Sequence, residues 1–427
     1  MKYTDYMENV NVRYGDGYVN VRVPPDNLKN IITPNAANPA GSANDEIERA
    51  INDPIGCGPL DTAAGSNALI LVDDITRLTP AGDILPRILD RLNAVGIDDN
   101  NIAALVALGT HRPMTRDEMI IKYGSGVYNR IRIINHDFKD PCLCDMGTTE
   151  NGTRVSVNRL LLEHDVVVGV GSVVPHHIPG FSGGAKIVQP GVCGEETTAG
   201  THLLSIRSRR SMLGILENPV RREMELIADK ANVKYVFNAV HDSRGRLIKG
   251  FFGDIRLAFR AAAAYSKRVY GVKIRGKTDI VLAGSYPCDL EFWQAHKTLY
   301  ACEAAVKEGG TMIIITPCPE GVSATHGDII DYANQRPEDI DAQIKNGVIT
   351  DKVAGALALA WAKIREYADV YLVTGGIGEE TVKKLGFSYF DTPGEALTAA
   401  FSRHGSGAGV TVIPAAGDIC PYTEDGA

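Results

Sequence analysis

Short runs of apolar residues alternate along the chain with segments whose apolar residues recur every three or four positions. The first run is NALILVDD at 67–74, and the next is NIAALVALG at 101–109. Between them, the segment 81–96 has helical spacing at Ile84, Leu85, Ile88, Leu89, Leu92 and Val95. Short continuous runs are typical of buried strands, and the wider spacing is typical of amphipathic helices. The pattern predicts repeated strand–helix units.

The alternation continues along the rest of the chain. Two further runs are IRII, just before Asn135, and DVVVGVGSVV, just before Pro175. Later runs occupy 278–285, 310–317, 369–376 and 409–417. Strands separated by helices usually pair in parallel, because the chain crosses back over the sheet between them. We therefore expect an α/β fold with mainly parallel sheets.

The length of the chain favours two domains, because 427 residues are too many for one compact core. The stretch GVKIRGKT at 271–278 contains glycine and basic residues, which is typical of a linker. We expect an N-terminal α/β domain at 1–272 that carries the cofactor and the catalytic residues. A C-terminal α/β domain at 273–427 would add substrate-binding residues, with the active site in the cleft between the two domains.

Two helix starts are indicated by capping residues. Thr79 before Pro80 suits an N-cap followed by a first helical turn. Thr115 and Glu118 have the spacing of a capping box. We therefore expect helices to begin just after DDITR and just after GTHR.

Composition and charge narrow the possible partners. Hydrophobic residues make up 44% and charged residues 22%, which is ordinary for a globular protein. The net charge of −8 argues against broad binding of nucleic acid or anionic membranes, although a local basic site could hold a small anion. We find no spanning segment and no signal-peptide core, so we expect a cytoplasmic protein that acts on a small molecule.

The eight cysteines do not resemble a disulfide framework. The tightest pair, Cys142 and Cys144, has no second Cys/His pair at zinc-site spacing. We interpret these cysteines as thiols rather than metal ligands.

Polar side chains follow the predicted strands at the points where the strands end. In open parallel sheets, ligands collect beyond the carboxyl ends of the strands, where loops and helix N-termini converge. The residues at these ends are Asp73, Asp74, Thr76 and Arg77; Thr110, His111 and Arg112; Asn135, His136 and Asp137; and Pro175, His176 and His177. We expect the functional site at this edge.

Each of these residues also has a structural interpretation. Arg77 at a helix start suits a carboxylate or phosphate, but it could equally pair with a neighbouring aspartate. Taken alone, His111 is more readily a structural histidine bonded to a backbone carbonyl. Neighbouring side chains in extended structure point in opposite directions, so we expect one of His176 and His177 to be structural.

The stretch VVPHHIPGFSGGAKIVQPG adds a lysine to this set. Its GFSGG turn lets backbone approach a ligand closely and could form an anion nest. Lys186 lies in apolar surroundings, where a lysine can become a nucleophile or simply extend its ammonium group to solvent. His202 could be a metal ligand or a core histidine. Together these residues predict covalent or metal-assisted chemistry on a small anionic substrate.

The ordered motifs DDITRLTP, GTHRPMT, NHD, PHHIPGFSGGAK, PGVCGEETTAGTH and QAHK extend through nearly the whole chain. In this order they resemble the lactate racemase family, whose members use the nickel-pincer nucleotide. The resemblance implies that Lys186 holds this pyridinium-3-thioamide-5-thiocarboxylate mononucleotide covalently and that His202 is the protein ligand to nickel. It further implies cofactor contacts from Asp74, Thr76, Ser182, Gly183 and Gly184.

The same resemblance implies the remaining roles. His111 and His176 would be the paired acid/base residues, and Arg77 with Lys297 would hold the substrate carboxylate. Gln294 and Trp293 would line the substrate pocket. Partners would be a 2-hydroxy acid and the enzymes that build the cofactor.

The chemistry of a 2-hydroxy acid agrees with these roles. Removing the C2 hydrogen as a proton would place negative charge next to an ionised carboxylate, whereas removing it as hydride yields a 2-keto acid. Inversion then requires a base on each face of the substrate, with a pKa near the working pH. Two histidines meet that requirement.

Some alternatives remain open at this point. Lactate-type members have a tyrosine before the glutamine, whereas Trp293 stands there in this chain, and Leu78 replaces a frequent proline. A larger or more polar 2-hydroxy acid is therefore as plausible a substrate as lactate. A protein that stores the nucleotide and a metal-dependent hydrolase are the other hypotheses, although no HExxH spacing supports the hydrolase.

Overall fold

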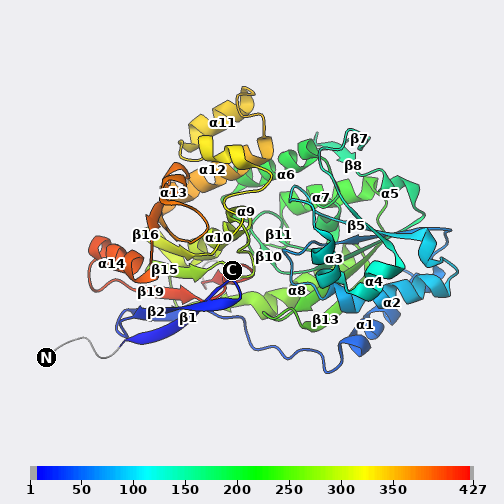
Figure 1. Cartoon of the computed structure of the whole chain (residues 1–427), viewed down its shortest axis with the longest axis horizontal. Helices are drawn as coiled ribbons and strands as arrows, with labels where there is room; N and C mark the ends of the chain where they lie inside the picture. The colour runs from blue at the N-terminus through cyan, green and yellow to red at the C-terminus, as the bar shows by residue number, and fades with distance from the viewer. Residues whose placement is uncertain (1–6, 424–427) are drawn as a thin grey trace. The chain divides into compact units, whose positions relative to one another are not determined.

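The computed structural model of the chain describes residues 7–423, which belong to two compact units. Unit 1 contains the chain up to Asn35, the short segment Arg209–Leu213 and the chain from Tyr270 onward. Unit 2 contains Ala36–Ser208 and Gly214–Val269. Each unit contains one six-stranded sheet together with helices (Figure 1). The expected α/β class with mainly parallel sheets is confirmed.

The sheet of unit 2 has the strand order β13-β12-β9-β4-β5-β6. Its strands are β4 (Ala68–Val72), β5 (Ile102–Val106), β6 (Arg132–Asn135), β9 (Val166–Ser172), β12 (Tyr235–His241) and β13 (Leu247–Asp254). Strands β12 to β6 are parallel, and β13 pairs antiparallel with β12. Every residue of β4 and β9 is buried, which explains why both strands read as continuous apolar runs.

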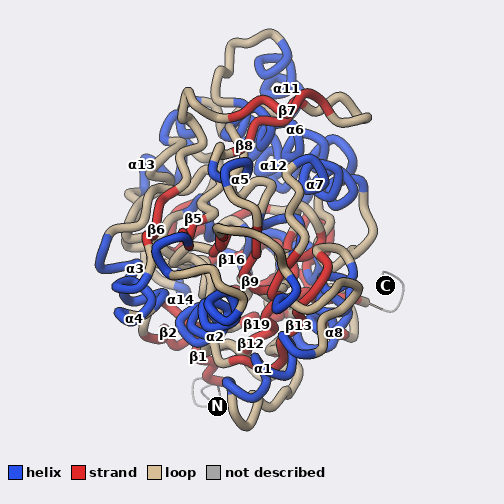
Figure 2. Tube along the Cα trace, turned by 90° about the vertical axis from the view of Figure 1, so that its right-hand side faces the viewer, coloured by secondary structure: helices blue, strands red, loops and turns tan. Residues whose placement is uncertain are grey.

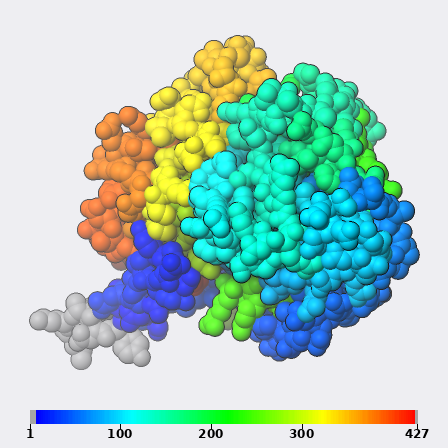
Figure 3. All heavy atoms as spheres, turned by 45° about the vertical axis from the view of Figure 1, so that its right-hand side comes forward, coloured from blue at the N-terminus to red at the C-terminus, as the bar shows by residue number. Residues whose placement is uncertain are grey.

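Alternate residues of β4 face two separate cores of unit 2. Ile70 and Val72 pack with residues of α1, α2 and α3, and Leu69 and Leu71 pack with residues of α7. The helices of this unit are α1 (Ala43–Asn52), α2 (Ala81–Ala94), α3 (Arg116–Tyr123), α4 (Ser125–Arg130), α5 (Leu160–Glu163), α6 (Glu195–Ser208), α7 (Pro219–Lys230) and α8 (Leu257–Tyr270), whose last residue belongs to unit 1. Figure 1 shows α2, α3 and α4 side by side, and the blue spheres in Figure 3 include the outer sides of α1 and α2.

Short elements of unit 2 connect its strands and helices. Strands β7 (Cys144–Thr148) and β8 (Arg154–Val157) form a hairpin next to α6 (Figure 2). Strands β10 (Pro175–His176) and β11 (Gly180–Phe181) form a second, very short hairpin. Three 3-10 turns are η1 (Leu60–Thr62), η2 (Asp99–Asn101) and η3 (Gly184–Ile187).

The sheet of unit 1 is parallel throughout, in the order β18-β17-β16-β15-β19-β3. Its strands are β3 (Leu28–Ile31), β15 (Thr278–Gly284), β16 (Val306–Ile315), β17 (Asp369–Val373), β18 (Ser388–Phe390) and β19 (Val410–Ile413). Because β3 pairs with β19, the N-terminal part of the chain completes a sheet whose other strands all follow Tyr270.

The remaining elements of unit 1 surround this sheet. The strands β1 (Glu8–Tyr14) and β2 (Gly17–Val23) form an antiparallel hairpin, and Val10, Val12, Val21 and Val23 enter the core of the unit. The helices are α9 (Phe292–Ala295), α10 (Lys297–Ala305), η4 (Gly327–Asp331), α11 (Pro337–Lys345), α12 (Lys352–Tyr367), α13 (Glu379–Lys384) and α14 (Pro393–His404). No helix within residues 7–423 combines the length and apolar character needed to cross a membrane.

One local expectation from the sequence is wrong. Helix α2 begins at Ala81 with Pro80 as its N-cap residue, and the Thr79 hydroxyl donates to the Asp73 carboxylate instead of capping the helix. The expected linker at 271–278 begins with β14 (Gly271–Lys273), which pairs with β20 (Cys420–Tyr422), and its role as a linker stays a prediction. By contrast, the capping box of Thr115 and Glu118 is confirmed at the start of α3.

The expected division at residues 272 and 273 stays a prediction about domains. The compact unit that holds the C-terminal strands also holds the N-terminal hairpin and β3. Pairing between residues nearly 400 positions apart, such as Leu28 with Val410, leaves no local pattern in the sequence that could have revealed it.

Candidate active site

The carboxyl ends of β9, β4 and β5 lie next to one another in unit 2, because these strands are parallel neighbours in the sheet. The loop after β5 is joined to the segment that follows Lys186 by a hydrogen bond from Gly109 N to Gly191 O, 2.9 Å long. The structure therefore brings three of the expected strand ends to one edge. The expected site residues in these loops and the elements that follow them are Asp74, Thr76, Arg77, His111, His176, Ser182, Gly183, Gly184, Lys186 and His202.

The turn after β4 is held by the carboxyl group of Asp74, which is buried. Its Oδ1 accepts hydrogen bonds from the Thr76 hydroxyl at 2.6 Å and from the Thr76 backbone N–H at 3.2 Å. Arg77 N donates to Asp74 O at 3.2 Å and closes the turn. The half-buried Arg77 therefore starts from a fixed backbone position at the end of the strand.

The other carboxylate oxygen of Asp74 binds His111. The distance from Asp74 Oδ2 to His111 Nδ1 is 2.6 Å. Burial by itself would raise the pKa of the Asp74 carboxyl, but the charge and hydrogen bond of His111, together with the charge of Arg77, hold that pKa well below its ordinary value. An ionised carboxylate can only accept, so Nδ1 of His111 carries hydrogen and Nε2 is the nitrogen that can take up a proton.

Lys122 and Tyr123 of α3, which we did not predict, hold the turn after β4 in place through hydrogen bonds. The buried Lys122 ammonium donates to Arg77 O at 2.5 Å and to Thr79 O at 3.1 Å, and its nitrogen lies 3.5 Å from Asp73 Oδ1. The Tyr123 hydroxyl donates to Asp73 O at 2.9 Å. A signal was present in the sequence, because Lys122 falls three positions after the buried Met119 on the apolar face of its helix.

His176 and His177 do not point in opposite directions, so the expectation of alternating side chains is wrong. Their rings stack with centroids 4.7 Å apart and planes 13° from parallel. The reason is that β10 ends at His176, and His177 already belongs to the following turn, where strand alternation no longer applies. His176 Nδ1 accepts a hydrogen bond from Ile178 N at 3.2 Å, which places the proton of the neutral ring on Nε2.

The segment before Lys186 is bound by the protein's own groups on several sides. Ser182 N donates to Val174 O at 2.8 Å, and its hydroxyl donates to Ser172 O at 2.7 Å. Gly184 N donates to Asn238 Oδ1 at 3.0 Å. These amides are therefore used within the protein, which argues against the expected anion nest at this turn.

The positive φ angles of Gly183 and Gly184 have a packing explanation. A Cβ on Gly183 would lie 2.4 Å from a methyl carbon of Val173, and one on Gly184 would lie 2.7 Å from the ring of Phe259. The glycines let the loop fit against these side chains. Lys186 follows on η3, half-buried, between the buried Ala185 and Ile187.

His202 lies in the middle of α6, and its ring orientation is fixed from within the helix. Its Nδ1 contacts Thr198 O at 2.8 Å, and a carbonyl can only accept. The neutral ring therefore has its hydrogen on Nδ1 and a lone pair on Nε2. The side chain of Gln189 donates to Thr201 Oγ1 at 2.7 Å and ties the stretch just after Lys186 to the residue before His202.

His136 is a structural residue rather than a member of the site. It is buried, its Nε2 lies 2.9 Å from Cys193 O, and its Nδ1 accepts from Asn158 Nδ2 at 3.2 Å. Burial lowers its pKa, so it is held as a neutral imidazole. Within residues 7–423, His, Cys, Asp and Glu side chains form no cluster of three that could bind a metal by themselves.

Trp293, Gln294 and Lys297 lie on a different unit from the residues above, at α9 and the start of α10 in unit 1. The Lys297 ammonium donates to Gln294 Oε1 at 2.5 Å. The buried Trp293 indole stacks on the His326 ring with centroids 4.1 Å apart, and His326 Nδ1 lies 2.5 Å from Asp351 Oδ2. This contact leaves no pattern in the sequence, because His326 lies in a loop far along the chain from Trp293.

Comparison with known proteins places this arrangement in a family. Residues 14–214 match the family model of the lactate racemase N-terminal domain, and residues 273–419 match that of the lactate racemase C-terminal domain. The lactate racemase of Thermoanaerobacterium thermosaccharolyticum is 29% identical over 422 residues, which cover 96% of this chain and 98% of that protein. The lactate racemase of Lactiplantibacillus plantarum is 30% identical over 385 residues, covering 87% and 89%.

Solved structures agree with these matches. The lactate racemase apoprotein from Thermoanaerobacterium thermosaccharolyticum superposes with a TM-score of 0.85 at 27% identity, covering 97% of this chain and 100% of that one. A protein from Thermotoga maritima, with a TM-score of 0.71 and 20% identity, covers 91% and 100% and shows likeness of fold alone. The chain therefore belongs to the lactate racemase family, as its ordered motifs suggested.

Proposed function

We propose that the chain is a racemase or epimerase that inverts C2 of a 2-hydroxy carboxylic acid. Family membership supports an isomerase, and the names of the relatives make lactate the first substrate to test. The observation that carries the proposal is the contact between His111 and the buried Asp74. It lies at the same sheet edge as Arg77 and residues 179–186, which we call the lysine segment. It prepares a general base next to a group that can bind a carboxylate.

The residues present fit a nickel-pincer nucleotide. Lys186 is half-buried on a segment held by hydrogen bonds, so its amine is a suitable attachment point for the nucleotide. His202 has its hydrogen on Nδ1, which leaves the Nε2 lone pair for nickel, as ligand histidines usually require. When bound, the group supplies an acceptor for the C2 hydrogen and its electron pair. Asp74, Thr76, Ser182, Gly183 and Gly184 stay predictions as contacts of the nucleotide.

His111 acts on the hydroxyl proton of the substrate in this proposal. Asp74 keeps Nδ1 protonated, so Nε2 takes the proton as the hydroxyl becomes a carbonyl, and the nearby carboxylate stabilises the resulting imidazolium. The arrangement needs no movement of the ring, because Asp74 is itself fixed by Thr76.

His176 serves the opposite face in this proposal. Its neutral form presents a proton at Nε2, so it can hold the substrate oxygen by donating a hydrogen bond. To exchange a proton at Nε2 it must carry hydrogen on Nδ1, which requires its contact with Ile178 N to open. That contact is 3.2 Å long, and a neutral hydrogen bond contributes only about 1 kcal/mol net. His176 can therefore take up hydrogen on Nδ1 at a small cost in free energy.

Arg77 binds the substrate carboxylate in this proposal, through the two-pronged contact that a guanidinium offers. Lys297, Gln294 and Trp293 stay predictions as substrate contacts. The stack of Trp293 on His326 holds the indole in one orientation, which supports a role for Trp293 in the choice of substrate side chain. We further propose that the protein works in the cytoplasm with the enzymes that build the nucleotide, and without nucleic acid or membrane partners.

The test is to produce the chain together with the cofactor-building enzymes and to measure intact mass, nickel content and racemisation. L-lactate, malate and a sugar acid are offered separately, and both enantiomers are quantified by chiral chromatography. The proposal expects an adduct on Lys186 and interconversion of at least one of these acids. An unmodified mass, or an adduct without any interconversion, would contradict it, and the second result would favour storage of the nucleotide. The Lys186→Ala chain is the control for the adduct.

A further inference from the structure

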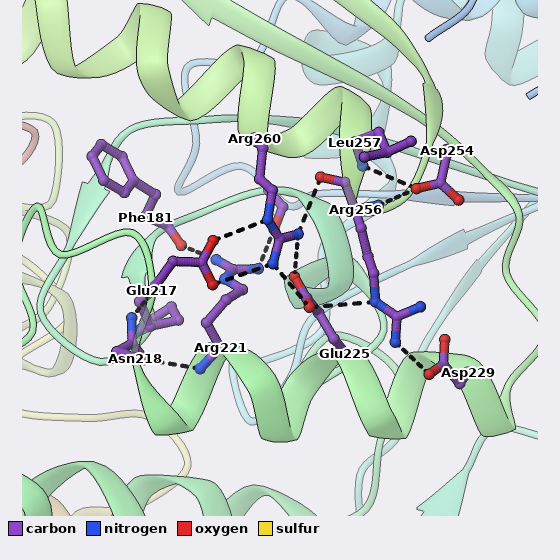
Figure 4. A network of polar contacts seen from close by, with 12 residues as sticks. Phe181, Glu217, Asn218, Arg221, Glu225, Asp229, Asp254, Arg256, Leu257 and Arg260 are labelled. Carbon is purple, nitrogen blue, oxygen red and sulfur yellow. Dashed lines mark hydrogen bonds and ion pairs between the residues drawn. The ribbon is translucent and has the colours of Figure 1, made fainter. Parts of the chain in front are cut away.

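The lysine segment is held through its backbone carbonyls by donors from one short stretch, residues 214–221, which leads into the first turn of α7. Gly214 N donates to Gly180 O at 3.0 Å, and Asn218 Nδ2 donates to Pro179 O at 3.1 Å. Arg221 donates to two further carbonyls, from Nη1 to Gly183 O at 3.0 Å and from Nη2 to Phe181 O (Figure 4). Four carbonyls in five residues are thus bound from the same side.

Arg221 is an unusual residue for this task, because its charged side chain is completely buried. The guanidinium lies over the ring of Phe259, with Cζ 3.9 Å from the ring centroid. Burial lowers its pKa, which indicates how fully water is excluded around it. A buried charge is expensive unless it is hydrogen-bonded, so two well-placed carbonyls account for its presence here.

The carboxylates of Glu217 and Glu225 lie near Arg221 and favour its charged form, whereas the neighbouring Arg260 opposes it. Arg260 bridges Glu217 and Glu225, with its Nε and Nη1 each 2.9 Å from an oxygen of one of the two carboxylates. Arg256 contacts Glu225 at 3.3 Å and also Asp229 (Figure 4). This network fixes the first turns of α7, whereas Arg221 alone among the three arginines contacts the lysine segment.

Gly183 O connects Arg221 to Lys186 directly. The same carbonyl that accepts from Arg221 Nη1 also accepts from Lys186 N at 3.2 Å, and that second bond closes the 3-10 turn on which the lysine lies. The direction of this carbonyl therefore sets the start of the turn. A lysine at position 221 could not reproduce the two-pronged contact, since it has one nitrogen instead of a planar fork.

The approach of α7 to the loop also explains one glycine. Gly180 has a φ of +82°, and a Cβ there would lie 1.9 Å from Ile215 O. No other residue fits without moving the backbone of the stretch before α7. The loop at Gly180 and the stretch before α7 therefore pack closely against each other.

We propose that Arg221, assisted by Asn218, is a positioning residue that sets the conformation of the 179–186 segment so that the Lys186 amine is presented for modification. The inference rests on the proposed function for the role of Lys186, but the positioning itself does not. In the protein without the nucleotide, Arg221 already limits the conformations of the segment. Loss of its fork is expected to loosen the segment and to slow attachment at Lys186.

The experiment compares Arg221→Lys, Asn218→Asp and the control Arg256→Met. Asn218→Asp keeps the oxygen that caps α7 but removes the amide donor to Pro179 O. Arg256→Met removes an arginine of the same network that does not contact the segment. Two quantities are measured: hydrogen exchange of peptides covering residues 179–188 in the unmodified protein, and the fraction of adduct by intact mass after production with the cofactor-building enzymes.

Positioning predicts that Arg221→Lys speeds exchange in this segment by about tenfold, equivalent to about 1.4 kcal/mol of local stability, and lowers the adduct fraction. Asn218→Asp should show a smaller change in the same direction, and Arg256→Met should show none in this segment. Exchange that rises equally throughout unit 2, or an unchanged segment with normal loading in Arg221→Lys, would overturn the inference. If Arg221→Lys does not fold, an unchanged segment and normal loading in Asn218→Asp would overturn it. If the unaltered chain itself takes no adduct, the proposed function fails, and hydrogen exchange alone decides whether Arg221 positions the segment.

Discussion

The turn after β4 and the segment before Lys186 lie at the same edge of one sheet, but they are held in different ways. In the turn, side chains bind other charged or polar side chains: Asp74 holds His111 and Thr76. In the lysine segment, the backbone itself is bound by Arg221 and Asn218. The first arrangement couples groups that can gain or lose protons, and the second fixes a shape. We infer that the turn serves proton transfer and that the lysine segment serves placement of a bound group.

The two proposed acid/base histidines differ in the same way, because Nδ1 contacts a side chain in one and the backbone in the other. Nδ1 of His111 gives its hydrogen bond to a carboxylate, which favours a positively charged ring. Nδ1 of His176 receives a hydrogen bond from a backbone N–H, which favours a neutral ring. Substitutions can test whether this difference matters for the reaction.

The largest expected effect comes from removing either histidine. His111→Gln and His176→Gln should each reduce racemisation by about 10³-fold or more, near the upper range for acid–base catalysis. Both directions should be lost, because one turnover uses both bases. Initial rates from each enantiomer are the measurement. His164→Gln is the control, since His164 follows α5, outside the proposed site, and its Nδ1 contacts Leu160 O at 2.8 Å. Near-normal activity in either variant would remove that histidine from the scheme.

A smaller effect is expected from Asp74→Asn. The amide cannot stabilise a charged His111 and can turn its NH₂ toward Nδ1, which reverses the tautomer, so kcat should fall by about 10²-fold while the fold is kept. The control is Asp90→Asn, which alters the exposed ion pair between Asp90 and Arg130. A kcat equal to that of the unaltered enzyme would show that the carboxylate does not assist His111.

Lys122→Met should affect substrate binding more than turnover. Loss of the ammonium leaves Asp73 without its buried counter-charge and Arg77 O without a donor, so we expect a loss of about 3 kcal/mol in the free energy of unfolding and a several-fold rise in KM. Lys383→Met breaks only an exposed pair and should change neither quantity. Urea unfolding and steady-state kinetics measure both. An unchanged KM in Lys122→Met would show that the contacts of Lys122 do not influence substrate binding by Arg77.

The smallest expected effect is a pH dependence of stability. The pKa of Asp74 is lower in the folded than in the unfolded chain, so its carboxylate contributes stability that is fully present above about pH 4 and is lost as pH falls through the lowered folded-state pKa. The difference in unfolding free energy between the unaltered chain and Asp74→Asn should therefore shrink as pH falls below about 4. A difference that stays constant or grows as pH falls below about 4 would contradict the assigned shift.

Much of the fold was predictable from the sequence, because β4 and β9 are fully buried, β5 is nearly so, and all three appear as continuous apolar runs. The strand ends were predictable for the same reason, and they led to Asp74, Arg77 and His111. The pairing of β3 with β19 was not, since strands distant in sequence leave no local pattern.

Other details of the site depended on turns or on long-range contacts. β10 ends at His176 and His177 already lies in the following turn, so strand alternation misled us. Thr79 bonds to Asp73 rather than capping α2, because the turn brings that carboxylate within reach of its hydroxyl. Arg221 falls three positions before the buried Met224 on its helix, so its burial could be inferred, but its two carbonyl partners could not.

The most direct test of the account is the fate of the hydrogen at C2, because His111 and His176 are assigned to the hydroxyl proton and not to that hydrogen. The enzyme carrying its nucleotide is given substrate with deuterium at C2 in ordinary water, and unlabelled substrate in heavy water. We predict inverted product that keeps its deuterium in the first case and gains almost none at C2 in the second. Substantial exchange of C2 hydrogen with solvent would mean that a histidine removes it as a proton, which would contradict the proposed hydride transfer.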